Sequence, residues 1–223
     1  MPTITQISEH PRKPGRYIID VDGAEFAVVN VDVLTEAKVR IGVVIDDVRA
    51  AQLLEAGQVV ETYDRALNLL AFRARSAREL GRRLAEKGAS PATVEKVIDK
   101  LRDVGLIDDA DFARQVARSK VSGGASKRRL HQELFKRGVA RDVADAVVTE
   151  VLEQENVDQV AIAERVARKR LPSLASADAQ SRRRRLYAFL ARRGHDSETI
   201  RTVMQRVLDE TPGADDVEGI EVE

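Results

Sequence analysis

The sequence predicts a mainly α-helical protein, a tandem repeat of three three-helix units that follow a small N-terminal β-hairpin or sheet. Charged residues make up 33% of the 223 residues and aromatic residues only 4%, which favours helices with long charged side chains over a β-sandwich. One helical segment occurs three times, and strand-forming sequence is confined to the N-terminal region. Because repeated helical units bury their cores against neighbouring units, we expect an elongated and curved body.

The N-terminal region contains the sequence pattern of a β-hairpin. Apolar residues alternate within residues 16–29, RYIIDVDGAEFAVV, and Asp22 and Gly23 between the two β-prone runs form a tight-turn signal. Residues 3–7, TITQI, can add a third strand. A sheet of two or three strands is not stable by itself, so a helix must cover it.

Two short helices are expected to cover this sheet. Residues 31–37 can supply the first of them. Residues 47–56 predict the second, which begins after Asp46 as its N-cap and ends at Gly57. We therefore expect a strand-rich extension with short helices over residues 1–57.

From residue 58 onward the sequence predicts only helices, and the repeated segment lies in this part. Its copies share the pattern L-x3-L-x3-G, in which leucines four positions apart lie on one helix face. The glycine stands where a residue in the left-handed conformation ends a helix. The copies are ARELGRRLAEKG at 77–88 with Leu80, Leu84 and Gly88, KRRLHQELFKRG at 127–138 with Leu130, Leu134 and Gly138, and RRRLYAFLARRG at 183–194 with Leu186, Leu190 and Gly194.

Each copy is flanked by two further helices. A second helix with regularly spaced apolar positions follows each glycine, and a leading helix precedes each copy, in a looser form in the first. The three-helix units therefore span residues 58–106, 107–155 and 156–210. The extra length of the third unit falls in a loop at 172–180. The acidic end, 211–223, has few large apolar residues and is expected to be a disordered tail.

The formal net charge is zero, but the charges are unevenly distributed. Residues 1–62 hold 6 Lys and Arg against 10 Asp and Glu, residues 63–211 hold 31 against 22, and residues 212–223 hold none against 5. Because fields are screened beyond about 8–10 Å at cellular salt, the local excess matters more than the total. A basic helical body between acidic ends favours a polyanionic or acidic partner.

The basic residues of the repeated helices are the candidate binding site. With the leucines facing the core, the position two residues before the first leucine points outward, and it is arginine in all three copies. Cations that directly precede the glycines are explained by the helix dipole instead, and a solvated helix face remains the alternative for the others. The candidates for contact with a polyanion, such as nucleic acid, or with an acidic protein surface are Arg78, Arg82, Lys127, Arg128, Arg129, Lys136, Arg182, Arg183, Arg184, Arg185 and Arg192.

Other chemistry has little support in the sequence. The chain has no cysteine and three dispersed histidines, so we expect no disulfide, no metal site, no cofactor and no catalytic residues. Residues 122–127, SGGASK, lack the spacing of a phosphate-binding loop. The N-terminus lacks the apolar core of a secretory signal, and no run of 18 apolar residues exists. We therefore expect a cytoplasmic monomer without membrane contact.

Several motifs, in the same order, resemble the RecX family. They are AFRARSARELGRRLAEKG, LRDVGLIDDADFARQVARSKV, SKRRLHQELFKRGV and RRRLYAFLARRGHDSETI, and the resemblance covers about residues 60–208. The segment PGRYIIDVDGAEFAV is similar to the strand-rich extension of some members. Two positions depart from the family pattern, because Ala74 replaces a frequent proline and His195 a frequent aromatic residue.

The resemblance implies a helical-repeat protein without enzymatic activity that binds the RecA recombinase filament and inhibits or remodels it. Such a protein modulates homologous recombination, DNA repair and the SOS response. The resemblance also implies phosphate contacts with single-stranded DNA, and with duplex DNA in some members. Two alternatives remain open: a helix-turn-helix regulator that binds a defined duplex site, and a helical-repeat scaffold that binds only proteins.

Overall fold

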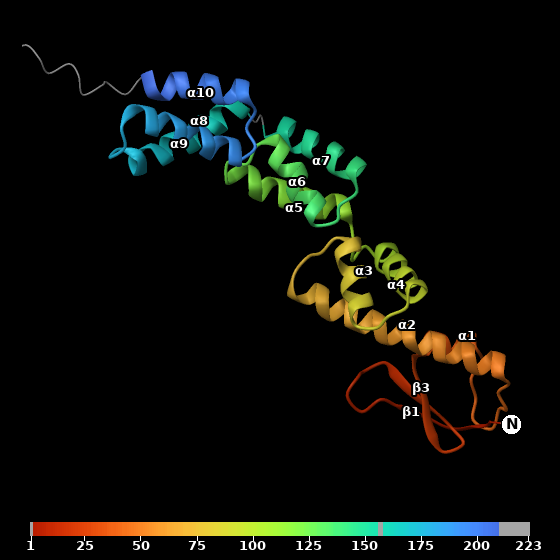
Figure 1. Ribbon diagram of the computed structural model, residues 1–223. Helices are drawn as coiled ribbons and strands as arrows, with labels where there is room; N and C mark the ends of the chain where they lie inside the picture. Colours follow the sequence, from red (N-terminus) through yellow and green to blue (C-terminus); the bar gives the residue numbers. More distant parts are fainter. Residues whose placement is uncertain (1, 156–157, 210–223) are drawn as a thin grey trace, which may run out of the picture. The chain divides into compact units, whose positions relative to one another are not determined.

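The computed structural model describes residues 2–155 and 158–209, and the chain folds as two compact units, residues 1–108 and 109–223 (Figure 1). The first unit holds a sheet and the first helical repeat, and the second unit holds the other two repeats. This confirms the predicted fold class. The acidic tail expected at 211–223 lies outside the described residues.

Strands β1 (Ile4–Glu9), β2 (Arg16–Val21) and β3 (Ala24–Asn30) form an antiparallel sheet in that order. The turn residues Asp22 and Gly23 have φ angles of 51° and 82°. A two-residue hairpin turn of type I′ has this pair of left-handed conformations, and its twist matches that of the strands. The predicted hairpin and the predicted third strand are both confirmed.

Helices α1 (Val31–Glu36) and α2 (Asp47–Phe72) follow the sheet. Asp46 caps α2 as predicted, because its side chain accepts a hydrogen bond from the Arg49 N–H at 2.8 Å. The predicted helix end at Gly57 is wrong, since α2 continues through this residue to Phe72.

Gly57 lies inside α2, at a point where β3 passes close to the helix. A Cβ atom at Gly57 would lie 3.2 Å from the Val28 carbonyl oxygen, so a larger residue would push the helix away from the sheet. The same helix packs Leu53 into the core beneath the sheet and Ala66 into the core of the first repeat. The boundary expected after residue 57 therefore coincides with no break in secondary structure, and the five-part division of the chain stays a prediction.

Each repeat combines a leading helix, a helix with the leucine pair and a closing helix. The leading helix of the first repeat is the C-terminal part of α2. The remaining bounds are α3 (Ala77–Glu86), α4 (Pro91–Asp103), α5 (Asp109–Ser122), α6 (Lys127–Lys136), α7 (Arg141–Gln154), α8 (Gln159–Arg170), the 3₁₀ helix η1 (Leu171–Leu174), α9 (Ala179–Arg192) and α10 (Ser197–Asp209).

The predicted leucine pairs form the centre of the three repeat cores. All six leucine side chains are at most 1% exposed, and each pair packs in a separate apolar cluster. Burying a leucine side chain contributes about 1.5–3 kcal/mol. These pairs are therefore the main anchors of the helices that carry the candidate cations. The residues concerned are Leu80, Leu84, Leu130, Leu134, Leu186 and Leu190.

The three glycines end these helices as predicted. Gly88, Gly138 and Gly194 have φ angles of 92°, 80° and 84°. In each case the N–H of the following residue donates to the carbonyl of the second leucine, at 3.2, 3.1 and 3.3 Å. This is the six-residue hydrogen bond of a Schellman motif, which needs a left-handed residue. The three helices therefore end in the same geometry.

The third repeat differs from the others at the start of its leucine helix. The predicted loop at 172–180 is partly wrong, because η1 occupies its beginning and the first turn of α9 occupies its end. Asp178 caps α9 by accepting a hydrogen bond from the Ser181 N–H at 2.8 Å. α9 has 14 residues, whereas α3 and α6 have 10. The extra turn, residues 179–182, adds one cation, Arg182, before Leu186.

Within the second unit, the loop before α6 contacts the third repeat. Ser126, the N-cap of α6, donates its hydroxyl hydrogen to the Arg193 carbonyl oxygen at 3.0 Å, and Arg193 donates a guanidinium N–H to the Gly123 carbonyl oxygen at 3.0 Å. A Cβ atom at Gly124 would lie 2.3 Å from Val166. A glycine is therefore required where the two repeats approach each other.

The position after each glycine is apolar in two repeats and histidine in the third. Ala89 and Val139 stand where the third repeat has His195. The His195 side chain is 6% exposed, and neither ring nitrogen has a hydrogen-bond partner among the described residues. Burial lowers the pKa of His195, and the neighbouring Arg193 lowers it further. The ring is therefore neutral in the folded protein at pH 7.

We expect His195→Val to make the protein less sensitive to acid. An unfolded histidine has a pKa of about 6.5. Below that pH the unfolded chain binds a proton that the folded protein does not, so the free energy of unfolding falls as pH drops, by at most about 1.4 kcal/mol per pH unit. Denaturant unfolding at pH 7.5 and 5.5 should show the variant gaining stability relative to the parent at the lower pH. An identical difference at both pH values would contradict this.

Candidate nucleic-acid and protein interface

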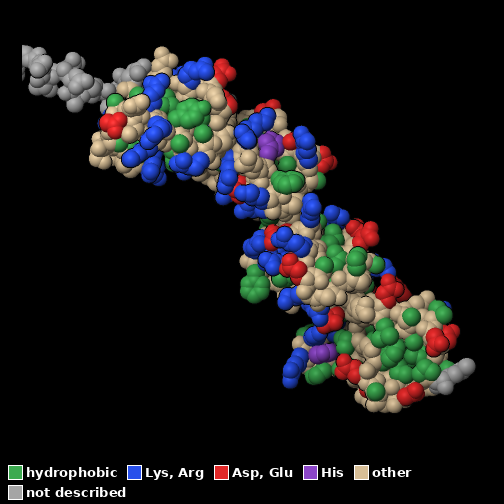
Figure 2. Space-filling view, viewed as in Figure 1, with side chains coloured by type: hydrophobic (Ala, Val, Ile, Leu, Met, Phe, Trp, Pro, Cys, Tyr) green, Lys and Arg blue, Asp and Glu red, His purple; other side chains and the backbone are tan. Residues whose placement is uncertain are grey.

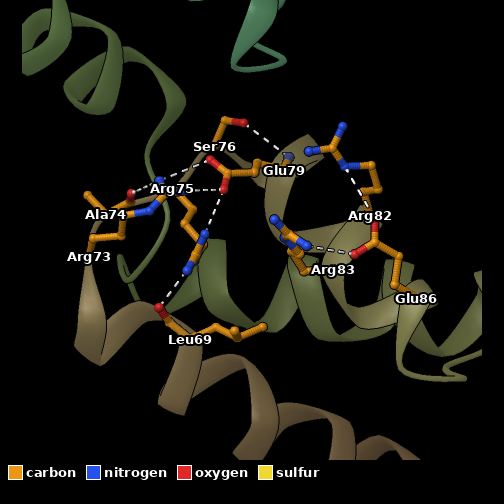
Figure 3. Close-up of polar contacts among 9 residues, drawn as sticks. All are labelled: Leu69, Arg73, Ala74, Arg75, Ser76, Glu79, Arg82, Arg83 and Glu86. Atoms are coloured by element: carbon orange, nitrogen blue, oxygen red, sulfur yellow. Dashed lines mark hydrogen bonds and ion pairs between the residues drawn. The ribbon is translucent and has the colours of Figure 1, made fainter.

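The segment that joins α2 to α3 holds a compact ion cluster (Figure 3). Ser76 caps α3 by accepting a hydrogen bond from the Glu79 N–H at 3.1 Å. The Glu79 carboxylate accepts hydrogen bonds from Arg73 at 3.1 Å and from Arg75 at 2.6 Å, and Arg75 also donates to the Leu69 carbonyl oxygen at 3.2 Å. The cluster fastens the end of α2 to the start of α3. These two arginines are therefore engaged in the fold.

We expect Glu79→Gln to destabilise the first repeat. Burial opposes ionisation of Glu79, but the hydrogen bonds from Arg73 and Arg75 outweigh it and lower the pKa of the carboxyl group. The Glu79 side chain is 9% exposed, and hydrogen bonds to charged groups each contribute about 1.5–3 kcal/mol. Urea unfolding at pH 7 should show that the free energy of unfolding falls by about 1.5–3 kcal/mol.

The pH dependence of the Glu79→Gln effect provides its control. A lowered carboxyl pKa stabilises the fold above the unfolded pKa of about 4.3, and this contribution is lost as pH falls through the folded pKa. The difference between parent and variant should therefore shrink below about pH 4. A difference that stays constant in acid would show that the charge of Glu79 is not what holds the joint.

Most of the predicted cations lie free on the outer faces of the leucine helices. Each is exposed, and its side chain makes no ion pair or hydrogen bond with any residue that the structure describes. Seven lie on α6 and α9, which belong to the same unit, and one lies on α3 in the other unit. Figure 2 shows basic side chains gathered over the segments of α6 and α9. The eight residues are Arg78, Lys127, Arg128, Lys136, Arg183, Arg184, Arg185 and Arg192.

Two other predicted cations are paired with carboxylates of their own helices. Arg82 lies 3.8 Å from Glu86, which also pairs with Arg83 at 3.0 Å (Figure 3). Arg129 lies 2.8 Å from Glu133. Arg82 and Glu86 are both exposed, and because such a pair contributes only about 0.3–0.5 kcal/mol, a competing phosphate or carboxylate can displace it. Glu133, in contrast, is only 12% exposed and also pairs with Arg137. The charge of these two arginines is nevertheless partly neutralised.

The structure gives Arg182 a role in the fold. Its guanidinium group donates to the carbonyl oxygens of Ala175 and Ala177, at 3.3 and 3.2 Å. This side chain therefore holds the segment before α9 and is only partly exposed. The spacing could have indicated this, since Arg182 lies four residues before Leu186, on the core side of α9.

Arg193 does more than complement a helix dipole. Besides its hydrogen bond to Gly123, its guanidinium group lies over the Phe189 ring, 4.9 Å from the centroid, and Arg170 lies over the same ring at 5.6 Å. Arg137, the equivalent residue of the second repeat, pairs with Glu133 at 2.9 Å. Arg137 and Arg193, which directly precede Gly138 and Gly194, are thus tied into the fold, unlike the eight free cations.

The helical repeats match three models of one family, in chain order. The first three-helix domain of RecX matches residues 63–101, the second matches residues 108–148, and the third matches residues 157–204. Together these matches cover more than half of the chain.

The chain belongs to the RecX family. Curated proteins called regulatory protein RecX are similar to it over most of their length. The one from Pelodictyon phaeoclathratiforme is 38% identical over 154 residues, which are 69% of this chain and 91% of the relative. The one from Halorhodospira halophila is 40% identical over 148 residues, 66% of this chain and 89% of the relative.

A third RecX relative extends the similarity to the N-terminal sheet. The protein from Levilactobacillus brevis is 29% identical over 217 residues, which are 97% of this chain and 80% of the relative. A crystal structure of regulatory protein RecX has a TM-score of 0.75 and 23% identity and covers 94% of this chain and 100% of its own. The RecX structure from Lactobacillus salivarius has a TM-score of 0.58 and 20% identity, over 67% of this chain and 96% of its own. These two structures share the fold.

The described residues of this RecX family member contain neither a metal-binding cluster nor a candidate membrane span. No group of three or more His, Asp or Glu side chains is placed to hold a metal ion. None of the helices in the described ranges combines the length and the apolar character that a membrane span needs. The free cations therefore remain the strongest candidate site.

Proposed function

We propose that this protein regulates the RecA recombinase by binding the RecA filament on single-stranded DNA and inhibiting or remodelling it. It thereby modulates homologous recombination and DNA repair, and it acts as a cytoplasmic monomer rather than as an enzyme. Membership of the RecX family supports the regulatory role. The observation that carries the binding mode is the set of free cations on the outer faces of α3, α6 and α9.

The fold does not explain these cations. The leucines and the glycines build each repeat, and the arginines that precede Gly138 and Gly194 are tied into it. Free arginines and lysines on a helix repel one another, so a surface that keeps them unpaired suits an anionic partner. A RecA filament presents acidic protein surface and DNA phosphates together, and both would be attracted to these cations.

Direct contact with DNA is expected to be weak and independent of sequence. Contacts to phosphates release counterions, so the affinity falls steeply as salt rises, and non-specific dissociation constants lie at about 10⁻⁴–10⁻⁶ M at physiological salt. Tight, salt-insensitive binding to one duplex sequence would instead support a helix-turn-helix regulator.

The decisive experiment measures RecA with and without this protein. DNA-dependent ATP hydrolysis, strand exchange and filament length should all decrease at substoichiometric amounts of the protein. If an equimolar amount leaves all three unchanged, the proposal is wrong. Indifference to both RecA and nucleic acid would favour a scaffold that binds other proteins.

A further inference from the structure

The surface of the second unit exposes two aromatic side chains. Among its described residues, 109–155 and 158–209, the large hydrophobic side chains that are exposed are Phe135 at 72% and Tyr187 at 45%. Both lie on the leucine helices, Phe135 on α6 and Tyr187 on α9. The large aliphatic side chains of this unit, in contrast, are at least partly covered. The exposure is therefore selective for aromatic rings.

The repeat architecture does not require Phe135. The equivalent residues of the other two repeats are Ala85 and Ala191, and alanine is the better helix former. Phe112, on the leading helix of the same repeat, is buried in the core. The ring of Phe135 thus contributes little to the fold. Its exposed apolar surface costs free energy in water.

Free cations lie on the same helix as each exposed ring. Arg128 lies seven residues before Phe135, so the two side chains line one stripe of α6, about 10 Å apart along the axis. Lys136 follows Phe135 directly. On α9, Tyr187 lies three residues after Arg184, a spacing that places both on the same face. Figure 2 shows hydrophobic and basic side chains side by side over α6.

We propose that the outer faces of α6 and α9 form a site for single-stranded nucleic acid, in which unpaired bases stack on Phe135 and Tyr187. The neighbouring phosphates contact Arg128, Lys136 and Arg184. An aromatic ring offers a stacking surface to any base, and cations beside it hold the backbone. The inference rests on the proposed function, because it assigns the DNA contact of the filament to the second and third repeats.

The chemistry favours single strands over the two other occupants. In a duplex the base faces are stacked on one another, so an exposed ring finds no free face there. A protein partner that docked on hydrophobic surface would meet aliphatic side chains as well, and this unit keeps those covered. Single-stranded nucleic acid fits both features of this surface, because its bases can stack on the rings and its phosphates can contact the free cations.

The first test replaces Phe135 and measures binding to a fluorescent oligothymidylate. Phe135→Ala and Phe135→Leu should weaken binding at least about fivefold, since stacking on an aromatic side chain strengthens binding by about this factor or more per base. Phe135→Trp should restore it. Val48→Ala is the matched control, because Val48 is 67% exposed but lies outside the repeats. All four melting temperatures should match that of the parent.

Salt separates stacking from charge. Phe135→Ala should weaken binding equally at every salt concentration, because the ring carries no charge. Arg128→Gln should reduce the slope of log affinity against log salt by about 0.7, because it removes one phosphate contact with a single strand. If Phe135→Ala and Phe135→Leu bind the oligothymidylate as tightly as the parent, the stacking site does not exist.

Phe135→Trp also provides a local reporter, because the chain contains no tryptophan. Its fluorescence should be quenched saturably by oligothymidylate and much less by a duplex of the same length or by polyglutamate. Equal quenching by polyglutamate would overturn the proposal, since an acidic chain has no bases to stack.

The RecA assay distinguishes failure of this site from failure of the proposed function. If the parent inhibits RecA while the Phe135 variants bind oligothymidylate normally, the proposed function stands and the stacking site fails. If the parent leaves RecA unaffected while oligothymidylate quenches the Phe135→Trp protein, the stacking site stands and the proposed function fails. Loss of RecA inhibition with unchanged oligothymidylate affinity would assign Phe135 to a protein contact and overturn the proposal.

Discussion

Replacing Leu190 by alanine is expected to lower the free energy of unfolding by about 2–5 kcal/mol, the usual range for emptying a leucine position in a core. The Leu190 side chain is fully buried, and it packs with Ala163, Val203 and the other apolar residues of the third repeat. Its carbonyl oxygen also accepts the Schellman hydrogen bond from the His195 N–H. A cavity at this position therefore weakens both the packing of α9 in the core and the Schellman motif that ends the helix.

Denaturant unfolding of Leu190→Ala beside Arg192→Ala gives the matched comparison. Arg192 lies two residues further along the same helix, but it is exposed and unpaired among the described residues. Its replacement should change the free energy of unfolding by less than about 0.5 kcal/mol. Equal stability of the two variants would mean that the assignment of buried and outer faces of α9 is wrong.

The repeated helices could be predicted from the sequence because their structure depends on residues close together in the chain. Leucines four positions apart share a helix face whatever surrounds them, and a left-handed glycine ends a helix through hydrogen bonds within six residues. For that reason the buried positions Leu80, Leu130 and Leu186 and the helix ends at Gly88 and Gly138 all lie where the pattern places them.

Features that depend on distant residues could not be predicted in the same way. Gly57 has the same local signal as a helix-ending glycine, but β3 lies against it and the helix continues. Glycine serves there through its small size rather than its backbone freedom. Likewise, the role of Gly124 is set by Val166 in the next repeat.

The candidate site was partly predictable for a related reason. Position on the helix separates inner from outer faces, and eight of the eleven predicted cations are exposed and free among the described residues. Whether a cation has a partner depends on neighbouring segments, as the carbonyl oxygens bound by Arg182 show. The exposed ring of Phe135 lies in the same helix, but its significance emerges only when the other large hydrophobic residues of the unit are seen to be covered.

The double reversal Arg184→Glu with Arg185→Glu is expected to abolish RecA inhibition and oligothymidylate binding while the protein stays folded. Both arginines are exposed and have no partner among the described residues, so the fold loses no contact. At the interface, however, each change removes an attraction and adds a repulsion, and like charges brought together there can cost several kcal/mol. The melting temperature should therefore stay within a few degrees of the parent while inhibition disappears.

A second double reversal tests whether the position of the charge matters or only the total. Arg12→Glu with Lys13→Glu makes the same change in net charge at two exposed residues of the N-terminal extension. It should leave inhibition nearly intact, because at cellular salt a charge acts only over about 8–10 Å. If both double variants lose inhibition equally, overall charge controls the interaction and no local interface is needed. If Arg184→Glu with Arg185→Glu melts normally and still inhibits fully, the arginines of α9 form a solvated helix face and nothing more.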